Sequence, residues 1–287
     1  MSYTETDPAD EAHVKTASER IQDALLWLVF LAMISAAGYV LMLDYRYLQY
    51  EDRLAGIEDT REPVPMMPVS PSDQIRPYVP GSRPVGPSRE APDLSPFKIS
   101  PDMPEREPMV FSSDGNGALL AFGTISPGTA DIFERTLDSL NEPVTEIVLH
   151  SPGGSVQDAL TMAQLIRDKE LNTRIIANGY CASSCPLVFA GGVKREAHET
   201  AWIGVHQVYA PPSTFGSIQQ GMDDAQRISA QTQQALLDFG VDPVLWIKAM
   251  ETPKDQLYVL TAHELEELKL ATSVEFEPDQ AKSSNPS

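Results

Sequence analysis

One feature limits the fold of this chain more than any other: an apolar run near the N-terminus, residues 24–43, without a single charged side chain. Twenty helical residues rise by about 1.5 Å each, so the run spans roughly 30 Å, the thickness of the hydrocarbon core of a bilayer. Trp27 lies near one end of the run and tyrosines follow the other, as in the aromatic belts of membrane helices. The run therefore predicts one transmembrane helix.

A cleaved signal peptide is the competing interpretation of the same run. The residues before position 24 are net acidic, whereas a signal peptide begins with a positively charged segment. The run is also longer than the apolar segment of a signal peptide, which has about 7 to 15 residues. A retained anchor is therefore favoured. The orientation stays open, because Lys15 and Arg20 before the run nearly balance Arg46, Arg53 and Arg61 after it.

The segment that follows the apolar run is rich in proline. Thirteen of the 24 prolines lie between Pro63 and Pro108, among Ser, Gly, Arg and Glu residues and with almost no apolar periodicity. Such a segment buries too little surface to offset its ordering entropy, and proline favours extended conformations. We therefore expect a disordered Pro-rich linker that acts as a spacer.

Charge and cysteine content exclude several function classes. The 41 acidic and 21 basic side chains give a formal net charge of -20, which repels a phosphate backbone, so we expect no nucleic-acid partner. Two cysteines cannot build a disulfide framework, and one pair without distant histidines does not make a zinc site. We expect neither a metal nor an organic cofactor.

Beyond residue 110, short apolar runs alternate with helical patterns. This alternation is typical of repeated βα units around a parallel sheet, so we expect an α/β domain. The predicted organisation is a polar tail (1–23), the transmembrane helix (24–43), a juxtamembrane and Pro-rich linker (44–110), the α/β domain (111–277) and a disordered tail (278–287).

A Ser-Pro-Gly-Gly-Ser turn follows the apolar strand predicted at residues 147–149. Two successive glycines at the carboxyl end of a strand leave backbone N–H groups unobstructed, which suits an anion or a developing oxyanion. The alternative is an ordinary tight turn in which Ser155 caps the next helix. The Gly-Lys-Ser/Thr ending of a nucleotide P-loop is absent.

A second motif, Gly-Tyr-Cys-Ala-Ser-Ser-Cys-Pro at residues 179–186, joins a predicted strand to a short apolar helix. Peptide dipoles and free N–H groups at a helix N-terminus favour negative charge, so an activated Ser183 would be well placed there. Alternatively, a serine of this pair simply caps the helix. Cys181 and Cys185 bracket Ser183, and one helical turn brings their Cα atoms near the about 4.4 to 6.8 Å that a disulfide needs. Two small buried thiols remain the alternative.

His206 is the third candidate. On a strand, alternation places Trp202, Gly204 and His206 on one face, and the missing side chain of Gly204 leaves space beside the imidazole. Such a histidine can act as a general base, whereas an isolated histidine is more often structural, as we expect for His198 and His263.

The three motifs in this order resemble the Clp protease/crotonase superfamily, and especially predicted membrane-anchored or periplasmic ClpP-like serine peptidases. The resemblance covers residues 117–276. It implies a ClpP/crotonase-like spiral of ββα units, serine endopeptidase activity on peptide or protein substrates, and assembly into a homo-oligomer. It also implies a single-pass protein of a bacterial-type inner or plasma membrane, with the soluble domain outside the cytoplasm.

Residue by residue, the resemblance implies Ser183 as nucleophile, His206 as general base and Asp255 as the third member of a triad. The approach to Asp255 is about two residues longer than the pattern of the family, so Asp242 and Glu251 are substitutes. By the same resemblance, the backbone N–H groups of Gly153 and Ser184 would form the oxyanion hole.

Other functions stay open. A catalytically inactive scaffold or binding protein would keep the fold without turnover. A crotonase-type acyl-CoA enzyme shares the fold, but the serine and histidine at the expected places and the lack of an evident basic patch for coenzyme A argue against it. A serine–lysine pair would need Lys194 or Lys248, and neither lies in a better context than His206.

Overall fold

The computed structural model describes residues 16–58, 64–65, 69–78, 84–85, 92–99, 107–208 and 218–276. The chain divides into two compact units, Met1–Ile57 and Glu58–Ser287, which are described separately. Most of the predicted N-terminal tail and the predicted C-terminal tail lie outside the described residues.

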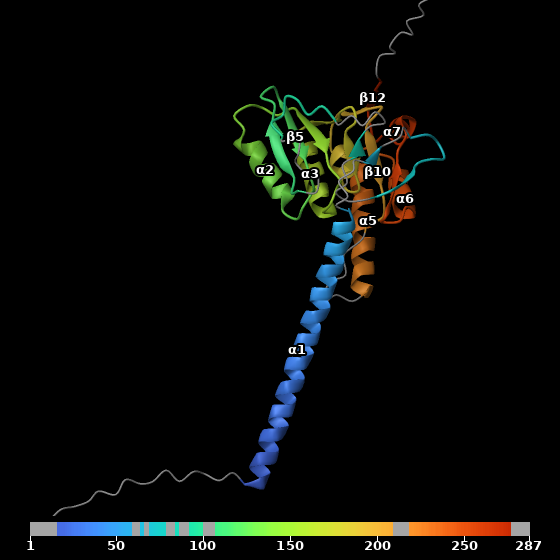
Figure 1. Cartoon of the computed structure of the whole chain (residues 1–287). Helices are drawn as coiled ribbons and strands as arrows, with labels where there is room; N and C mark the ends of the chain where they lie inside the picture. The colour runs from blue at the N-terminus through green and yellow to red at the C-terminus, as the bar shows by residue number, and fades with distance from the viewer. Residues whose placement is uncertain are drawn as a thin grey trace, which may run out of the picture. The chain divides into compact units, whose positions relative to one another are not determined.

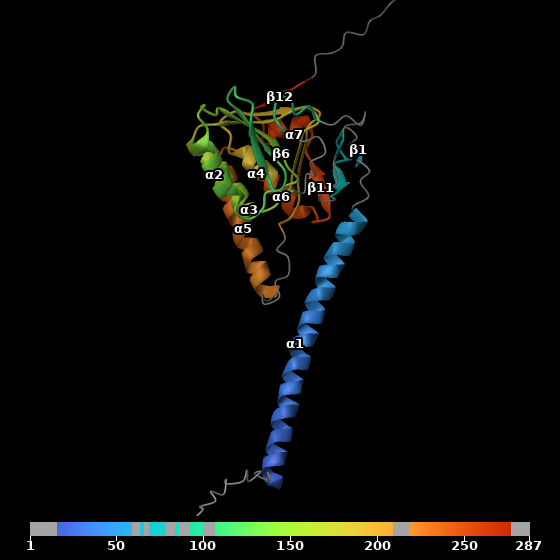
Figure 2. The same cartoon turned by 60° about the vertical axis from the view of Figure 1, so that its left-hand side comes forward.

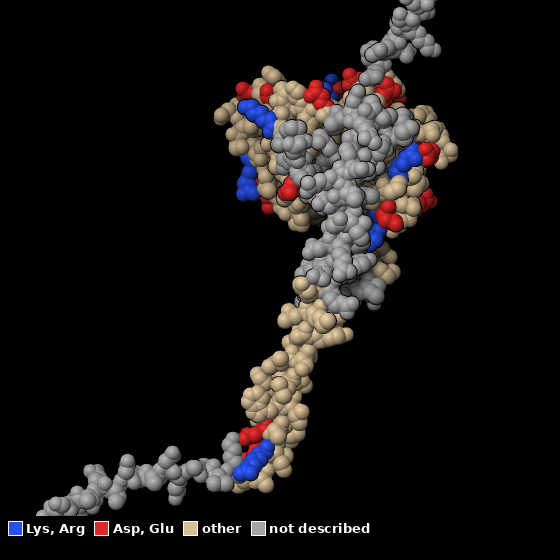
Figure 3. All heavy atoms as spheres, in the orientation of Figure 1, with Lys and Arg blue, Asp and Glu red and all other residues tan. Residues whose placement is uncertain are grey.

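Within the described residues, the first unit consists of the long helix α1 (Ala17–Glu58), whose last residue already belongs to the second unit. Its segment Ala17–Leu43, which contains an 18-residue window with a mean hydropathy of 2.2, is long and apolar enough to be a membrane span or a signal sequence. Figure 3 shows the uncharged surface of this segment, with charged side chains gathered at its first turns. The helix continues beyond the predicted end at residue 43, and no proline lies between that residue and Pro63 to interrupt it.

Two sheets form the framework of the second unit. The larger sheet has the strand order β12-β9-β7-β6-β5-β4, and its neighbours pair in parallel except for β4, which is antiparallel to β5. Its strands are β4 (Val110–Ser113), β5 (Ala118–Phe122), β6 (Glu146–His150), β7 (Asn172–Ile175), β9 (Arg195–His198) and β12 (Ser273–Glu275). The side chains of β5 and nearly all of β6 are buried, as in parallel strands covered on both faces.

The smaller sheet includes the strands that Ser183 and His206 directly follow. Its strand order is β2-β11-β10-β8, with β8 parallel to β10 and the other pairs antiparallel. Its strands are β2 (Ile75–Pro77), β8 (Tyr180–Ala182), β10 (Trp202–Val205) and β11 (Gln256–Val259). Separately, the short strands β1 (Val64–Pro65) and β3 (Pro84–Val85) pair in parallel.

Helices α2 to α7 complete the second unit. They are α2 (Thr129–Ser139), α3 (Val156–Asp168), α4 (Cys185–Ala190), α5 (Ile218–Asp238), α6 (Val244–Glu251) and α7 (Ala262–Glu267). Helix α3 contacts α2, α4 and α5, and α2 and α3 lie side by side in both views (Figure 1, Figure 2). The large side chains of Phe133, Met162 and Phe189 belong to one buried cluster between the helices and the sheets. The α/β fold expected from the alternating pattern is confirmed.

The Pro-rich segment differs from the expectation of a spacer without regular structure. Strand β2 lies within it and pairs with β11, where Arg76 faces Leu257. An edge strand tolerates Pro77, because the outer side of the strand needs no N–H donor. Further along the segment, Leu94 and Phe97 pack against a buried cluster that includes Phe122. Composition alone could not predict this, since the partners come from distant parts of the chain.

Candidate active site

Ser183 lies in the turn between β8 and α4 and is half-buried. Its φ of 61° is in the left-handed region, which residues with a side chain rarely adopt, and its N–H donates a hydrogen bond of 3.0 Å to the carbonyl oxygen of Gly204. An uncommon backbone conformation that persists must be held by its surroundings, and such positions cluster at functional sites.

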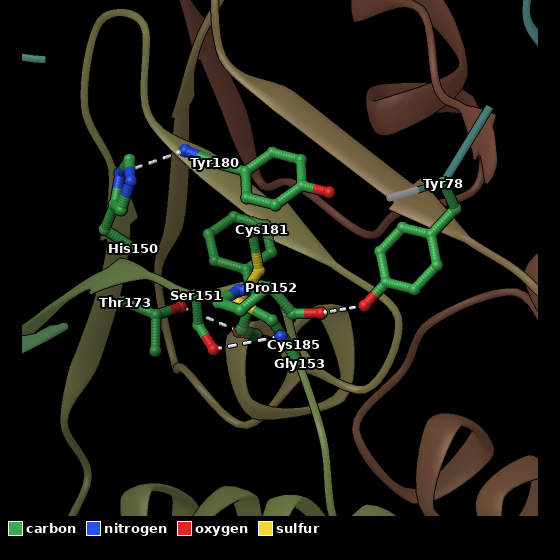
Figure 4. Close-up of a disulfide and its surroundings, with 10 residues drawn as sticks. Tyr78, His150, Ser151, Pro152, Gly153, Thr173, Tyr180, Cys181 and Cys185 are labelled. Carbon is green, nitrogen blue, oxygen red and sulfur yellow. Dashed lines mark hydrogen bonds between the residues drawn. A yellow bond between two sulfur atoms is a disulfide. The ribbon is translucent and has the colours of Figure 1, made fainter. Parts of the chain in front are cut away.

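A disulfide closes around this serine. Cys181 and Cys185 are joined, with Cα atoms 5.1 Å apart, and both side chains are fully buried (Figure 4). The bond ties the end of β8 to the start of α4, so it restricts the turn that carries Ser183.

His206 follows β10 directly and lines the same pocket as Ser183. The structure therefore brings together the two residues that the sequence motifs selected as nucleophile and base. The pocket is lined by Gly154, Val156, Ser183, Ser184, His206, Gln207, Val208 and Trp246.

The space beside Gly204 is not open, in contrast to the expectation. A Cβ atom at Gly204 would lie 2.5 Å from Cγ of Leu257, so the side chain of Leu257 fills the position. The glycine instead allows β11 to pack closely against β10 beside His206.

Burial decides the protonation state of His206. The side chain is 4 % exposed, and burial lowers its pKa to about 4, although a hydrogen bond to the backbone of Gln207 opposes the shift. His206 is therefore neutral at neutral pH, which is the state that can accept a proton. The ring of Tyr78 lies against it, with centroids 4.6 Å apart and an interplanar angle of 36°.

The Ser-Pro-Gly-Gly-Ser turn packs directly against the serine. Gly153 has a φ of 92°, and a Cβ atom there would lie 2.5 Å from the carbonyl oxygen of Ala182 and 2.8 Å from the nitrogen of Ser184. The predicted oxyanion donors, Gly153 and Ser184, are thus neighbours in space. In this state, however, the buried Gly153 N–H donates to Oγ of Ser151 at 3.1 Å (Figure 4).

Gly154 is a donor candidate that the sequence analysis did not select. It is exposed and lines the pocket with Ser183 and His206, and its φ of 140° favours glycine. A Cβ atom at Gly154 would lie 2.2 Å from the carbonyl oxygen of Ile125, so the turn approaches another backbone there. Both positions therefore need glycine because neighbouring backbone leaves no room for a Cβ atom, and not only because the chain turns there.

The same turn also begins α3. Ser155 precedes the helix, and its side-chain oxygen accepts a hydrogen bond from the N–H of Asp158, so the alternative expectation of a helix cap is confirmed.

Two buried polar groups of the pocket have no hydrogen-bond partner among the residues that the structure describes. They are Oγ of Ser184 and the indole nitrogen of Trp246. Buried polar groups are normally paired, so such groups in a pocket are available to water or a substrate.

The third member of the predicted triad stays a prediction. Asp255 is exposed just before β11, and its carbonyl oxygen accepts a 2.9 Å hydrogen bond from the N–H of Tyr78. A carboxylate hydrogen-bonded to the imidazole would raise the pKa of His206, whereas the pKa is lowered. Of the substitutes, Asp242 accepts from the N–H of Val244 at the start of α6, and Glu251 is exposed at the end of that helix.

The other histidines that the structure describes lie outside the pocket. Nδ1 of the buried His150 accepts a 3.2 Å hydrogen bond from the N–H of Tyr180 (Figure 4), and Nδ1 of His198 lies 2.9 Å from Oγ1 of Thr200. His263 is exposed on α7. The structural role expected for His198 agrees with its position, whereas the side chain of His263 is 85 % exposed and has no such role.

Neither lysine is suited to serve as a base. Burial lowers the pKa of Lys248, but hydrogen bonds to Tyr258 and Glu264 outweigh burial and raise it, so the ammonium group stays protonated. Lys194 is exposed outside the pocket. Within the described part of the chain, no group of three or more His, Cys, Asp or Glu side chains could hold a metal ion.

The second unit is thus an α/β domain in which a serine and a histidine line the same pocket. Residues 132–264 match the family model described as Clp protease, which includes both residues. A mutant of ClpP1 from Listeria monocytogenes, a solved structure, is 18% identical over 57% of this chain and 93% of that chain, with a TM-score of 0.44. The predicted resemblance to ClpP-like peptidases and the predicted ClpP-like α/β fold are confirmed, and a peptidase-type function is supported in general.

Proposed function

We propose that this protein is a membrane-anchored serine peptidase that hydrolyses peptide bonds by acyl transfer through Ser183. One observation carries the proposal: Ser183, held in a left-handed conformation, lines a pocket with the neutral, buried His206. A nucleophile beside a proton acceptor is the arrangement that activates a hydroxyl group.

The chemistry follows from these groups. A ring nitrogen of His206 accepts the proton of Ser183 as its oxygen attacks the peptide carbonyl carbon. Backbone N–H groups of Ser184 and of Gly153 or Gly154 donate hydrogen bonds to the tetrahedral oxyanion. The protonated imidazole then gives its proton to the leaving amine, and water hydrolyses the acyl-enzyme with His206 again as base.

We propose Asp255 as the third member of the triad in the reacting enzyme, since the lowered pKa of His206 argues against a carboxylate hydrogen bond to the imidazole in the conformation seen here. The part of Asp255 would be to orient the imidazole and stabilise its charge once His206 is protonated. Replacement by asparagine tests this directly: the Asp255→Asn variant should hydrolyse peptides more slowly than the wild type. Wild-type activity in that variant would remove Asp255 from the mechanism.

We further propose that α1 anchors the protein and that the domain faces an extracytoplasmic, oxidising compartment, where it assembles into a homo-oligomer. The apolar segment Ala17–Leu43 supports the anchor, and the bond between Cys181 and Cys185 supports an oxidising compartment. Protease digestion of the domain in spheroplasts, but not in inverted vesicles, would support this orientation. The opposite pattern would contradict it.

One observation favours a second function, a non-catalytic scaffold of the same fold. The Gly153 N–H is already bonded to Ser151, so one predicted oxyanion donor is engaged. In such a scaffold the hydrogen bond between Gly153 and Ser151 would persist, and the protein would not hydrolyse peptides.

The test uses the full-length protein in detergent, with a fluorogenic peptide pool and a fluorophosphonate probe. The peptidase hydrolyses the pool and is labelled, and Ser183→Ala abolishes both. Ser139→Ala, an exposed serine on α2, is the matched control and should behave as wild type. Absence of hydrolysis and of labelling in the wild type would favour the scaffold.

A further inference from the structure

The Pro-rich segment places one side chain at two parts of the candidate site. The ring of Tyr78 lies against the imidazole of His206, with centroids 4.6 Å apart. Its hydroxyl group donates a 2.6 Å hydrogen bond to the carbonyl oxygen of Pro152 (Figure 4). A residue from the expected spacer thus contacts both the proposed base and the turn that carries the oxyanion donors.

The bond to Pro152 matters because of peptide geometry. The carbonyl group of Pro152 and the N–H of Gly153 belong to the same planar peptide unit. Tyr78 holds the oxygen side of that unit, and Ser151 accepts from its N–H side. These two bonds fix the orientation of the peptide that leads into Gly154, which lines the pocket.

The backbone of the segment is anchored on β11. Strand β2 pairs with it, the N–H of Tyr78 donates to the carbonyl oxygen of Asp255 at 2.9 Å, and the N–H of Val259 donates to the carbonyl oxygen of Gln74 at 2.9 Å. The side chain of Gln74 also donates to Val259 and to Glu264. Main-chain and side-chain bonds at both ends of β2 therefore fix where Tyr78 lies.

Apolar contacts add to these bonds. Val69 and Tyr78 pack against a buried cluster that includes Tyr180 and Leu257. The cluster lies on β8, which directly precedes Ser183, and on β11, so the segment packs against the strand that leads into the nucleophile turn.

We propose that residues 69–78, which lie outside the region matched by the Clp protease family, are a built-in part of the active site, and that Tyr78 is a positioning residue for His206 and for the Ser151–Gly154 turn. This inference rests on the proposed function. The tilted ring of Tyr78 limits rotation of the imidazole, and its hydroxyl group holds the carbonyl group of Pro152 and thereby the turn on which Gly154 lines the pocket. Loss of either contact misplaces groups that must converge on one carbonyl group.

The experiment compares Tyr78→Phe and Tyr78→Leu in the full-length protein. Tyr78→Phe keeps the ring and loses the hydroxyl group, so we expect kcat to fall by about 3- to 10-fold, the usual effect of one hydrogen bond, with little change in KM. Tyr78→Leu loses both contacts and should lower kcat by about 100-fold. Asp138→Asn, which removes an exposed ion pair with Lys169 outside this segment, is the matched control and should keep wild-type kcat.

A second readout does not depend on activity. The ring of Tyr78 should shift the NMR signals of the His206 imidazole through its ring current, and His206→Gln identifies those signals. Tyr78→Phe should preserve the shift, whereas Tyr78→Leu should remove it. This signature reports the ring contact itself, which a general loss of stability would not selectively remove.

Two results would overturn the inference. One is wild-type kcat in both variants; the other is a rise in kcat for Tyr78→Phe, which would mean that the contact restrains the site. If the wild type neither hydrolyses peptides nor is labelled, the proposed function fails, and the NMR signal decides this inference alone. An unchanged His206 signal in Tyr78→Leu then overturns it, and a lost shift supports it.

Discussion

The burial of His206 predicts an unusual pH dependence for the labelling of Ser183. Because burial lowers the pKa of His206 to about 4, the imidazole stays neutral in mildly acidic solution. At pH 5, a group with this pKa is about 90 % neutral, whereas an ordinary histidine with a pKa near 6.5 is about 3 % neutral. The structure therefore predicts that labelling at pH 5 keeps about 90 % of its plateau rate, whereas an exposed histidine would keep about 3 %.

The assay is the second-order rate constant of fluorophosphonate labelling of the full-length protein between pH 4.5 and 8. The rate should be nearly constant down to pH 5. Near-UV circular dichroism at each pH shows whether the fold persists, and His263→Gln, which changes an exposed ring, is the control. A half-maximal rate near pH 6.5 would refute the argument from burial.

The same burial has a cost in stability, and its sign follows from the two pKa values. Above about pH 6.5, His206 is neutral in both the folded and the unfolded chain, so it contributes no pH dependence. Below that pH the unfolded chain takes up the proton first, and the free energy of unfolding falls as the pH approaches about 4. The loss is at most about 3 kcal/mol. His206→Gln should lack it.

Four further predictions concern stability and can be measured by urea unfolding. Ser183→Gly should be about 1 kcal/mol more stable than Ser183→Ala, because glycine adopts the φ of 61° without strain; equal stability would contradict this. Gly153→Ala should cost about 3 kcal/mol and prevent labelling, since its Cβ atom meets the carbonyl oxygen of Ala182; wild-type behaviour would show that the turn can shift. Replacing Cys181 and Cys185 together by alanine should cost about 2 kcal/mol, the chain entropy of so short a loop, and an unchanged midpoint would show that the bond adds no stability. Burial raises the pKa of Glu264, but hydrogen bonds from Thr261, Tyr258 and Lys248 outweigh it and lower the pKa to about 2, so stability present above about pH 4.5 is lost as the pH falls towards 2. After allowance for partial exposure this loss is about 1 kcal/mol, and Glu264→Gln should not show it.

The parts of the fold that the sequence predicts are those with a local signal. The alternation of apolar runs and helical patterns beyond residue 110 depends on neighbours in sequence, and it predicts the α/β domain. Ser183 and His206 could also be selected from the sequence, because Ser183 lies in a turn rich in small residues that follows a predicted strand, and His206 lies on another predicted strand. Strand ends in one sheet bring such residues together.

Contacts across long stretches of chain could not be predicted in the same way. Tyr78 reaches His206 only because β2 pairs with the edge of β11, and nothing in the composition of a Pro-rich segment indicates that pairing. The space beside Gly204 looks open in the sequence, yet the side chain of Leu257 comes from a partner strand to fill it. The place of Asp255 depends on the register at the start of β11, which residue spacing does not determine.

The central claim is that Ser183 is a nucleophile activated by His206. Its most direct test is mass spectrometry of the full-length protein after fluorophosphonate treatment, followed by peptide mapping, for the wild type and for His206→Gln. The account predicts one adduct per chain, on Ser183, which is nearly absent in His206→Gln. An adduct on another serine, no adduct at all, or equal labelling of the two proteins would contradict it.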